Sequence, residues 1–365
     1  MTAANPSVLH VLATLERGGT ESACLSLAAA FRAASLTNAV AALSRGRGDM
    51  EEALAVHAGP PAVLPRRRIA RVVSFYRLCR RRQPERVLLH LFTVDHVLLG
   101  LAARMAGVRR VVVVDGNPAP RDALRKVALI LTATRLAGIH LVCASRWIER
   151  SLAALGPLPA RTMVVHNGCP VDAIARRAAF ARARRRHDQI VITMVARLDP
   201  IKDHATLLRA FAALPATLGG RTLVLRLIGE GPLRAAIAKR AASLGIEDRV
   251  HLMGSRGDVP EQLGESDVFV FATTGEEGFG IALIEALAAG TPVIATSVPA
   301  CREVLEGAKE GERFGTLVRP RSAKALARAI FATVRDPPPP VDRQVVRRRY
   351  DTAVMAKGYL DALFR

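Results

Sequence analysis

With 365 residues, half of them hydrophobic and only 4% aromatic, the chain is longer than one hydrophobic core usually serves, and its composition is typical of a two-domain α/β protein. No run reaches the roughly 18 uncharged apolar residues of a membrane span, and the five cysteines lack the paired spacing of a zinc site or disulfide framework, which favours a reducing cytosol. The formal net charge of +21 suggests an anionic partner, either nucleic acid or an anionic membrane surface.

The chain begins with a strand, a glycine turn and a helix. Residues 6–15 form an apolar strand rather than a signal peptide, Gly18 and Gly19 follow it, and helical periodicity continues to Phe31. This order opens an open α/β sheet, although the spacing is not that of a dinucleotide fingerprint. The two glycines either let the backbone approach a phosphate or make a tight turn, and both roles suit glycine.

An arginine-rich segment follows the second strand. In residues 66–82, Ile69, Val72, Val73, Tyr76 and Cys79 recur at helical spacing, which leaves the arginines to one side and to the ends. The segment is either the solvated face of an amphipathic helix or an interfacial helix on an anionic leaflet.

Further strands complete the first half of the chain. The strand over 110–114 ends at Asp115, and the strand over 162–165 runs into a loop that contains Asn167. Open α/β sheets place ligands at the carboxyl ends of such strands. Residues 1–187 hold 29 Lys and Arg against 11 Asp and Glu, a net of +18, whereas residues 188–365 hold 24 against 21, a net of +3. The stretch from Arg176 to Arg186 is polar and basic and precedes the next apolar strand, so a domain boundary is expected near 170–188, after a basic first half.

The second half repeats the alternation of strands and helices. Arg197 and Lys202 share the loop after the strand over 190–195, where they either bind a diphosphate or form a solvated turn. The strand over 223–228 runs into Gly229. Four proline residues, 337–340, predict a stiff linker before a terminal helix over 345–364.

A buried helix over 281–289 is the most informative stretch of the chain. Every residue in it is apolar except Glu285, and a buried carboxylate costs several kcal/mol unless something hydrogen-bonds it. Glu277 lies just before the helix, beside glycines at a helix start, and such a start attracts phosphate. The stretch predicts a pocket for a phosphorylated ligand that carries hydroxyl groups.

Together these segments resemble the retaining GT-B glycosyltransferases of family 4. The likeness rests on the early G-G-T-E, the H-N-G loop, V-A-R-L-D-P-I-K-D-H, G-E-G-P, E-G-F-G and two glutamates eight residues apart, in order over nearly the whole chain. It implies two facing Rossmann-like α/β/α domains with a deep interdomain cleft, and a C-terminal helix that returns to the N-terminal domain. The implied domains are an acceptor-binding domain (1–172), a linker (173–187), a nucleotide-sugar-binding domain (188–344) and the returning helix (345–365).

The resemblance also implies roles for individual residues. Arg197 and Lys202 would clamp the donor diphosphate, Glu277 would contact sugar hydroxyls and Glu285 the ribose hydroxyls, so that Arg197, Lys202 and Glu277 are the expected catalytic residues. The backbone around the donor is expected to come from Gly18, Gly19, Gly229, Gly278, Phe279, Gly280 and Ile281. Asp115 and Asn167 are expected near the sugar or acceptor. No metal and no cofactor are expected, since the family needs none and no Asp-x-Asp cluster is present.

One position departs from the family pattern. Many members carry a histidine at the end of the strand where this chain has Asp115, and an aspartate cannot donate a hydrogen bond at neutral pH unless its pKa is raised. The histidine's role is therefore not transferred to Asp115.

The leading hypothesis is a glycosyltransferase that moves a sugar from a nucleotide-diphosphate sugar to a saccharide or lipid-linked acceptor in polysaccharide or glycolipid synthesis. Its expected location is the cytoplasm, with peripheral contact to the anionic inner face of the membrane. A nucleotide-sugar epimerase of the same fold is the alternative, and it would convert donor without acceptor. A nucleic-acid-binding protein is suggested by charge alone and disfavoured by the few aromatic residues, one Trp and three Tyr.

Overall fold

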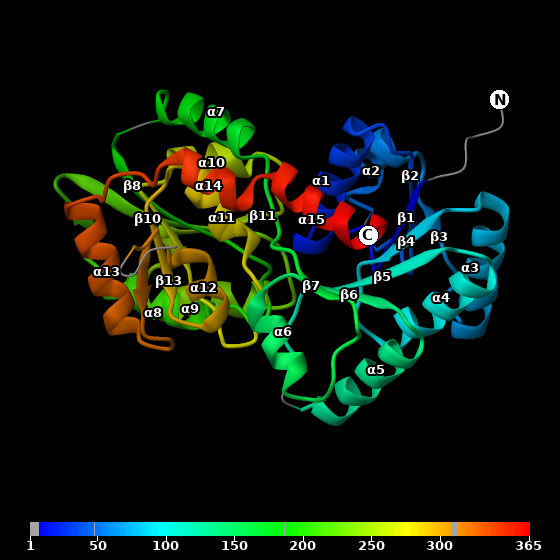
Figure 1. Ribbon diagram of the computed structural model, residues 1–365. Coiled ribbons are helices and arrows are strands. Elements are labelled where there is room, and N and C mark those ends of the chain that lie inside the picture. Colours follow the sequence, from blue (N-terminus) through cyan, green and yellow to red (C-terminus); the bar gives the residue numbers. More distant parts are fainter. Residues whose placement is uncertain (1–6, 47, 121, 186, 308–311) are drawn as a thin grey trace. The chain divides into compact units, whose positions relative to one another are not determined.

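The protein folds into two compact α/β units. The computed structural model describes residues 7–46, 48–120, 122–185, 187–307 and 312–365. Unit 1 comprises the chain up to Gly168 together with Thr352–Arg365, and unit 2 comprises Cys169–Asp351 (Figure 1). None of the helices in the described part of the chain combines the length and hydrophobicity that crossing a lipid bilayer requires.

Unit 1 is built on a seven-stranded parallel sheet of order β3-β2-β1-β4-β5-β6-β7. Its strands are β1 (Val8–Leu12), β2 (Asn38–Ala42), β3 (Ala62–Val63), β4 (Arg86–Leu89), β5 (Arg110–Asp115), β6 (His140–Cys143) and β7 (Thr162–Val164). Its helices are α1 (Gly19–Ala33), α2 (Glu51–Ala58), α3 (Arg68–Arg82), α4 (Val94–Met105), α5 (Leu124–Leu136), α6 (Arg146–Ala153) and α15 (Thr352–Phe364).

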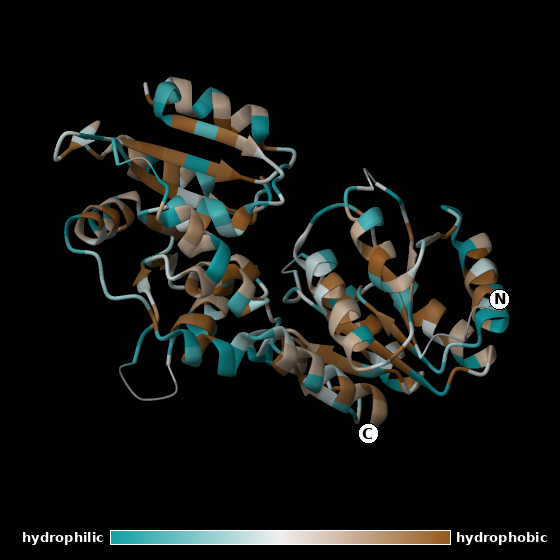
Figure 2. Ribbon diagram, turned by 90° about the horizontal axis from the view of Figure 1, so that it is seen from above, coloured by the Kyte–Doolittle hydropathy of each residue, from teal (hydrophilic) through white to brown (hydrophobic). Residues whose placement is uncertain are grey.

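The strands of unit 1 are apolar on both faces because helices cover both. Leu9 and Val11 of β1 pack with residues of α3, α4, α5 and α6. The alternating residue Val8 faces the other way and packs with residues of α1 and α15. Figure 2 shows the resulting hydrophobic sheet between helices of mixed hydropathy.

Unit 2 repeats this architecture with a parallel sheet of order β11-β10-β8-β12-β13-β14, to which the short β9 adds antiparallel to β10. Its strands are β8 (Gln189–Val195), β9 (Thr217–Leu218), β10 (Arg221–Ile228), β11 (Val250–Gly254), β12 (Val268–Phe271), β13 (Val293–Thr296) and β14 (Thr316–Val318). Its helices are α7 (Val171–Arg182), α8 (His204–Ala212), α9 (Arg234–Ser243), the 3₁₀ turn Glu247–Arg249, α10 (Val259–Glu265), α11 (Ile281–Ala289), α12 (Pro299–Leu305), α13 (Ala323–Arg335) and α14 (Arg343–Tyr350).

Two expected boundaries differ from the structure. The stretch 173–187, expected as a linker, is helical up to Arg182, and α7 packs on α10 and α11 within unit 2. The approach is so close that a Cβ on Gly264 of α10 would lie 2.2 Å from the carbonyl oxygen of Ala178. The single helix expected over 345–365 is two helices: α14 packs on α7 and α11 in unit 2, and α15 packs on α1 and β5 in unit 1.

Candidate functional site

The candidate site of unit 2 lies at the carboxyl edge of its sheet. The strands β10, β8 and β12 are adjacent and parallel, so the loops that follow them emerge at one edge. Strand order reverses between β8 and β12, because the chain proceeds from β8 to β10 and β11 on one side and from β12 to β13 and β14 on the other. Such a switch point is where open α/β sheets bind their ligands.

Backbone hydrogen bonds join the loop after β8 to the loop after β12. The Asp203 N–H donates to the Ala272 carbonyl at 3.0 Å, and the Thr274 N–H donates to the Ile201 carbonyl at 2.9 Å. This short antiparallel contact lies on both sides of Lys202 and fixes its backbone against the end of β12. Lys202 and the segment that leads to Glu277 are therefore held together by topology, although 75 positions separate them in sequence.

Lys202 and Glu277 form an ion pair. The Lys202 ammonium donates to the Glu277 carboxylate, and the two side chains are only 14% and 10% exposed. Thr273 donates a hydrogen bond at 3.1 Å to the Ile201 carbonyl and lies 3.3 Å from the same Glu277 oxygen. The ammonium also lies 4.6 Å from the centre of the Phe271 ring. The charge of Lys202 is thus placed at the switch point by several groups at once, of which the sequence predicted only Glu277.

His204 is a second residue that the sequence did not single out. Its ring is buried, and its Nδ1 lies 3.1 Å from the Lys202 carbonyl oxygen. Burial lowers the pKa of His204 and keeps the ring neutral, so Nδ1–H is the donor opposite the carbonyl. Because it acts on backbone, no side-chain pattern could reveal it.

Arg197 and Gly229 occupy neighbouring loops with different roles. The Arg197 side chain is 62% exposed, and its Nε lies 3.4 Å from a carboxylate oxygen of Asp199. Gly229 has a φ of +137°, and a Cβ there would lie 2.0 Å from the carbonyl oxygen of Ala196. Gly229 is therefore needed for the close approach of the two loops, and its expected contact with the donor stays a prediction.

The start of α11 is shaped by the predicted E-G-F-G segment. Gly278 leads into Phe279, which is buried and packs edge-on against Tyr350 with ring centres 6.1 Å apart. Gly280 is the N-cap with a φ of +86°, and Ile281 is the first helical residue. The first N–H groups of a helix have no partner in a preceding turn; the Leu283 N–H donates to the Gly280 carbonyl at 2.9 Å, and the N–H groups before it are the donors that this end of α11 can present to an anion.

Glu285 lies in the second turn of α11. Desolvation raises the pKa of its carboxyl from 4.5 to about 7, and no hydrogen bond from a described residue offsets that cost. A carboxyl in this state gains most from a ligand that donates hydroxyl hydrogens. A cavity of about 290 Å³ nearby is lined by Lys202 and by α8 and α9 residues but by neither glutamate, so it is a separate space.

The predicted residues of unit 1 also lie at the carboxyl edge of their own sheet. Gly18 is the N-cap of α1 and Gly19 its first residue, after β1, next to the point where strand order reverses between β1 and β4. Asp115 ends β5, and Asn167 follows β7. Asp115 is buried and accepts a hydrogen bond at 3.1 Å from the Asn117 N–H. Desolvation raises the pKa of Asp115 from 3.8 to about 7, so the condition for an aspartate to donate a hydrogen bond is met.

Cys24 lies near two buried histidines, an arrangement that cysteine spacing could not predict. Ligand atoms of Cys24, His10 and His90 lie within 4.8 Å of one another. The His10 and His90 rings stack, with His10 Nδ1 and His90 Nε2 3.1 Å apart, and His10 Nε2 lies 3.3 Å from the Asn38 amide oxygen. Both ring nitrogens of His10 thus have hydrogen-bond partners.

Comparison with known proteins places these features in context. Residues 175–349 match the family described as glycosyl transferases group 1. Among curated relatives, the GDP-mannose-dependent alpha-(1-6)-phosphatidylinositol monomannoside mannosyltransferase of Mycolicibacterium smegmatis is 30% identical over 263 residues, 66% of this chain and 65% of that protein. The N-acetylgalactosamine-N,N'-diacetylbacillosaminyl-diphospho-undecaprenol 4-alpha-N-acetylgalactosaminyltransferase of Campylobacter jejuni is 28% identical over 181 residues, 49% of this chain and 46% of that protein.

The chain therefore spans less than two thirds of the length of either relative.

Among solved structures, Anabaena Alr3699/HepE in complex with UDP and glucose matches with a TM-score of 0.84 and 18% identity, over 98% of both chains. This likeness confirms the two parallel-sheet α/β units of the GT-B fold that the sequence predicted.

Proposed function

We propose that this protein is a retaining glycosyltransferase that moves a sugar from a nucleotide-diphosphate sugar to a saccharide or lipid-linked acceptor, and the match of residues 175–349 to the family described as glycosyl transferases group 1 supports this. The observation that carries the proposal is the switch-point arrangement of unit 2, where the Lys202–Glu277 ion pair lies beside the start of α11 and the uncompensated Glu285 carboxyl lies one turn further on.

The diphosphate is assigned to the cations and the helix start. Lys202 supplies a fixed charge, Arg197 supplies an exposed guanidinium in the same loop, and the N–H groups at the start of α11 supply donors. The leaving diphosphate gains negative charge as the glycosidic bond breaks, and preorganised donors stabilise that charge most in the transition state.

The hydroxyl groups of the donor are assigned to the two glutamates. Glu285 is proposed to accept hydrogen bonds from the ribose, which would compensate the desolvation of its carboxyl and lower its pKa. Glu277 is proposed to bind the donor sugar while Thr273 and Lys202 hold its carboxylate in place. We assign the acceptor's proton to the leaving diphosphate and propose no metal, which predicts full turnover in EDTA.

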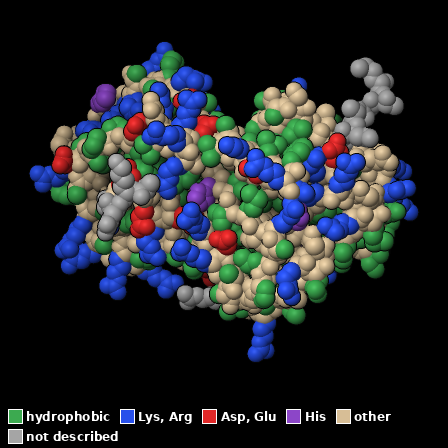
Figure 3. Space-filling view, in the orientation of Figure 1, with side chains coloured by type: hydrophobic (Ala, Val, Ile, Leu, Met, Phe, Trp, Pro, Cys, Tyr) green, Lys and Arg blue, Asp and Glu red, His purple; other side chains and the backbone are tan. Residues whose placement is uncertain are grey.

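The acceptor is proposed to be lipid-linked and at an anionic membrane surface. The names of both relatives include a lipid, phosphatidylinositol in one and undecaprenol in the other. In α3, Phe75 and Cys79 are buried, whereas Ile69 and Val73 are 83% and 41% exposed. Exposed arginines flank these two aliphatic side chains at positions 66, 67, 68, 77, 80, 81 and 82. Figure 3 shows Lys and Arg side chains spread over the visible face of unit 1 with few acidic ones between them.

Aliphatic side chains among arginines suit the interface of an anionic bilayer. Flotation with phosphatidylglycerol vesicles should carry the protein, and Ile69→Ser with Val73→Ser should lose it while Leu129→Ser, an exposed change on α5, should not. Equal flotation of all three proteins would contradict the assignment.

A transfer assay tests the enzymatic proposal. A thermal-shift panel of UDP-, GDP- and ADP-sugars identifies the donor, because ligands that bind the folded state raise the melting temperature. Lys202→Ala and Glu285→Ala should each abolish transfer, whereas Lys239→Ala, an exposed lysine of α9, should not. Full activity in either site variant would overturn the assignment, and conversion of donor without acceptor would identify an epimerase instead.

A further inference from the structure

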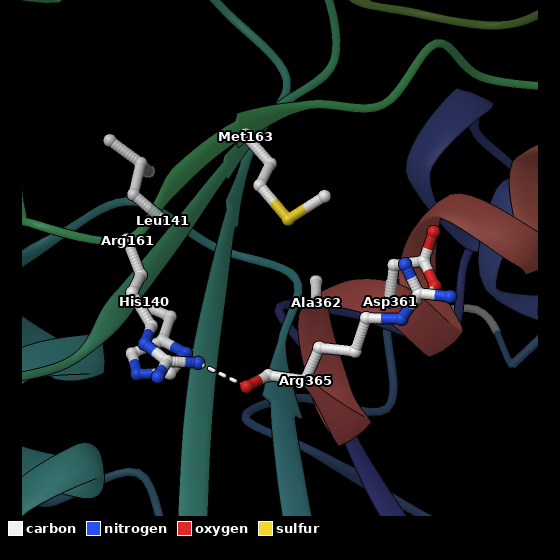
Figure 4. A pocket seen from close by; sticks show the side chains of 7 residues that line it. All are labelled: His140, Leu141, Arg161, Met163, Asp361, Ala362 and Arg365. Atoms are coloured by element: carbon white, nitrogen blue, oxygen red, sulfur yellow. Dashed lines mark hydrogen bonds and ion pairs between the residues drawn. The ribbon is translucent and has the colours of Figure 1, made fainter.

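A cavity of about 320 Å³ lies in unit 1, away from the residues assigned to the reaction (Figure 4). Its lining residues are His140, Leu141, Arg161, Met163, Asp361, Ala362 and Arg365. His140 begins β6 and Arg161 immediately precedes β7, so the cavity lies at the amino edge of the parallel sheet. Gly18 and Asp115 lie at the carboxyl edge, which is the opposite one. The volume is in the range of small-molecule sites.

Parallel pairing gathers basic residues at this amino edge. Arg86 and Arg110 begin adjacent strands and are partners in the ladder register, and His140 and Arg161 follow on the next two strands. Within the described residues, Glu85 pairs with Arg86. Asp361 pairs with Arg365 at 3.2 Å, and no Asp or Glu side chain in the same part of the chain pairs with Arg104, Arg110 or Arg161.

This crowding of positive charge has an electrostatic cost. Desolvation, Arg161 and Arg86 lower the pKa of Arg110, and its Nη1 is buried without a hydrogen-bond partner. The pKa of His140 is lowered by burial and by the surrounding Arg110, Arg161 and Arg104. The cluster therefore holds cations that repel one another more than the surrounding protein compensates.

The last turn of α15 accounts for part of this charge. Arg86 Nε donates to the Leu363 carbonyl at 3.0 Å, Arg161 donates to the Arg365 carbonyl, and His140 hydrogen-bonds the Ala362 backbone. These contacts suit the negative end of a helix dipole. Arg110 takes no part in them, so the helix end leaves one guanidinium without compensation.

We propose that this cavity binds a phosphate-type oxyanion on a compact organic group. Arg161 and Arg365 line the cavity from different elements; Figure 4 shows the Arg161 guanidinium beside His140 and the Arg365 side chain turned toward its partner Asp361. Arg161 is therefore the guanidinium assigned to the anion, and Arg110 adds positive charge beside it. Guanidinium groups match the oxygens of phosphate through paired N–H donors. Leu141, Met163 and Ala362 supply apolar walls for the organic group. The site is independent of the glycosyl transfer proposed above, because it uses other residues at the other edge of the sheet.

The NMR signal of the His140 ring reports on this cavity separately from the proposed nucleotide-sugar site of unit 2. Inorganic phosphate and butyl phosphate, titrated against chloride at equal ionic strength, should shift the His140 ring resonance saturably, with the signal assigned through His140→Gln. Arg161→Gln and Arg110→Gln should each weaken the affinity at least about tenfold, the usual worth of a charge-assisted hydrogen bond. Arg125→Gln, an exposed change on α5, is the matched control and should not.

The two variants also separate binding from folding. Arg161→Gln removes a contact to α15 and should lower the melting temperature, whereas Arg110→Gln removes repulsion and should raise it, yet both should lose phosphate binding. Phosphatidylcholine vesicles with and without phosphatidic acid distinguish a lipid phosphate from a soluble one. Absence of a saturable His140 shift with every probe, or an equal shift in both arginine variants, would overturn the proposal.

Discussion

Replacing Asp115 by asparagine should stabilise the protein at neutral and higher pH. The carboxyl group is buried at the end of β5, and desolvation raises its pKa from 3.8 to about 7. An asparagine keeps an oxygen for the Asn117 N–H and removes the ionisation. Since the folded state disfavours the charged carboxylate, the wild-type protein loses stability as the pH rises from about 4 to 7, and the variant does not share this loss.

The size of the effect follows from the shift in pKa. One pKa unit corresponds to about 1.36 kcal/mol, so a rise from 3.8 to about 7 is worth roughly 4 kcal/mol at full ionisation. The free energies of unfolding of variant and wild type should therefore agree near pH 4 and differ by about 3 to 4 kcal/mol at pH 8. Urea denaturation across this pH range measures the difference in free energy of unfolding. The other ionisable groups are the same in both proteins, so their contributions cancel.

An exposed carboxyl in the same loop, between β5 and α5, supplies the control. Asp122→Asn should leave the difference near zero at every pH, because Asp122 is exposed. A difference between Asp115→Asn and wild type that is flat with pH, or that falls as the pH rises, would refute the claim that burial holds this carboxyl near its neutral form. If the rise is found, Asp115 carries a proton on about half of the molecules at pH 7.

Three further predictions concern unit 2. Gly229→Ala should destabilise the protein by about 3 kcal/mol or more in thermal melts, because its φ of +137° and a carbonyl 2.0 Å from the added Cβ leave no room, whereas Gly257→Ala should be tolerated. Lys202→Met should lower the free energy of unfolding by about 3 kcal/mol, because it leaves the Glu277 carboxylate without its cation. The double variant Lys202→Met with Glu277→Gln should recover most of that loss, and losses that simply add would show that the two side chains are not coupled. Glu285→Gln should weaken donor binding. Its free energy of unfolding relative to wild type should rise by about 2 kcal/mol as the pH rises from 4.5 to 7, a value reduced to allow for the partial exposure of Glu285. A variant that is more stable than wild type only at low pH would contradict desolvation as the cause.

The sheets could be predicted because their strands leave a strong local signal. The run over 110–114 is apolar at every position after Arg110, which indicates burial on both faces, and the structure places alternate residues in two different cores. Alternation of such strands with helices then predicts parallel sheets. Similar apolar runs in the second half of the chain predicted that Arg197, Lys202 and Glu277 follow the ends of strands.

The prediction of a linker over 173–187 is wrong because the buried face of its helix consists largely of alanine. Ile174, Ala178 and Ala181 of α7 are buried at helical spacing, but arginines between them dominate the composition of the segment. Two of the three side chains that are buried within the expected linker are a single methyl group, so they contribute little hydrophobicity while still allowing close helix packing.

The ion pair and its supports could not be found locally. Lys202 and Glu277 meet only because β8 and β12 are neighbours in the sheet. Thr273 and His204 act largely on the Ile201 and Lys202 carbonyls, and a backbone acceptor is present at every position of a sequence. Such positioning residues become visible only when the loops are placed.

The break at Asp351 makes unit 1 discontinuous along the chain. Met355, Tyr359 and Leu363 of α15 fill the core that also contains Val8 and Phe31. During synthesis the first half of the chain therefore emerges with a hydrophobic surface that its own residues cannot cover, and the covering helix arrives only after all of unit 2 has been made. Unit 2 is continuous and can fold as it emerges, so the order of completion runs opposite to the order of translation.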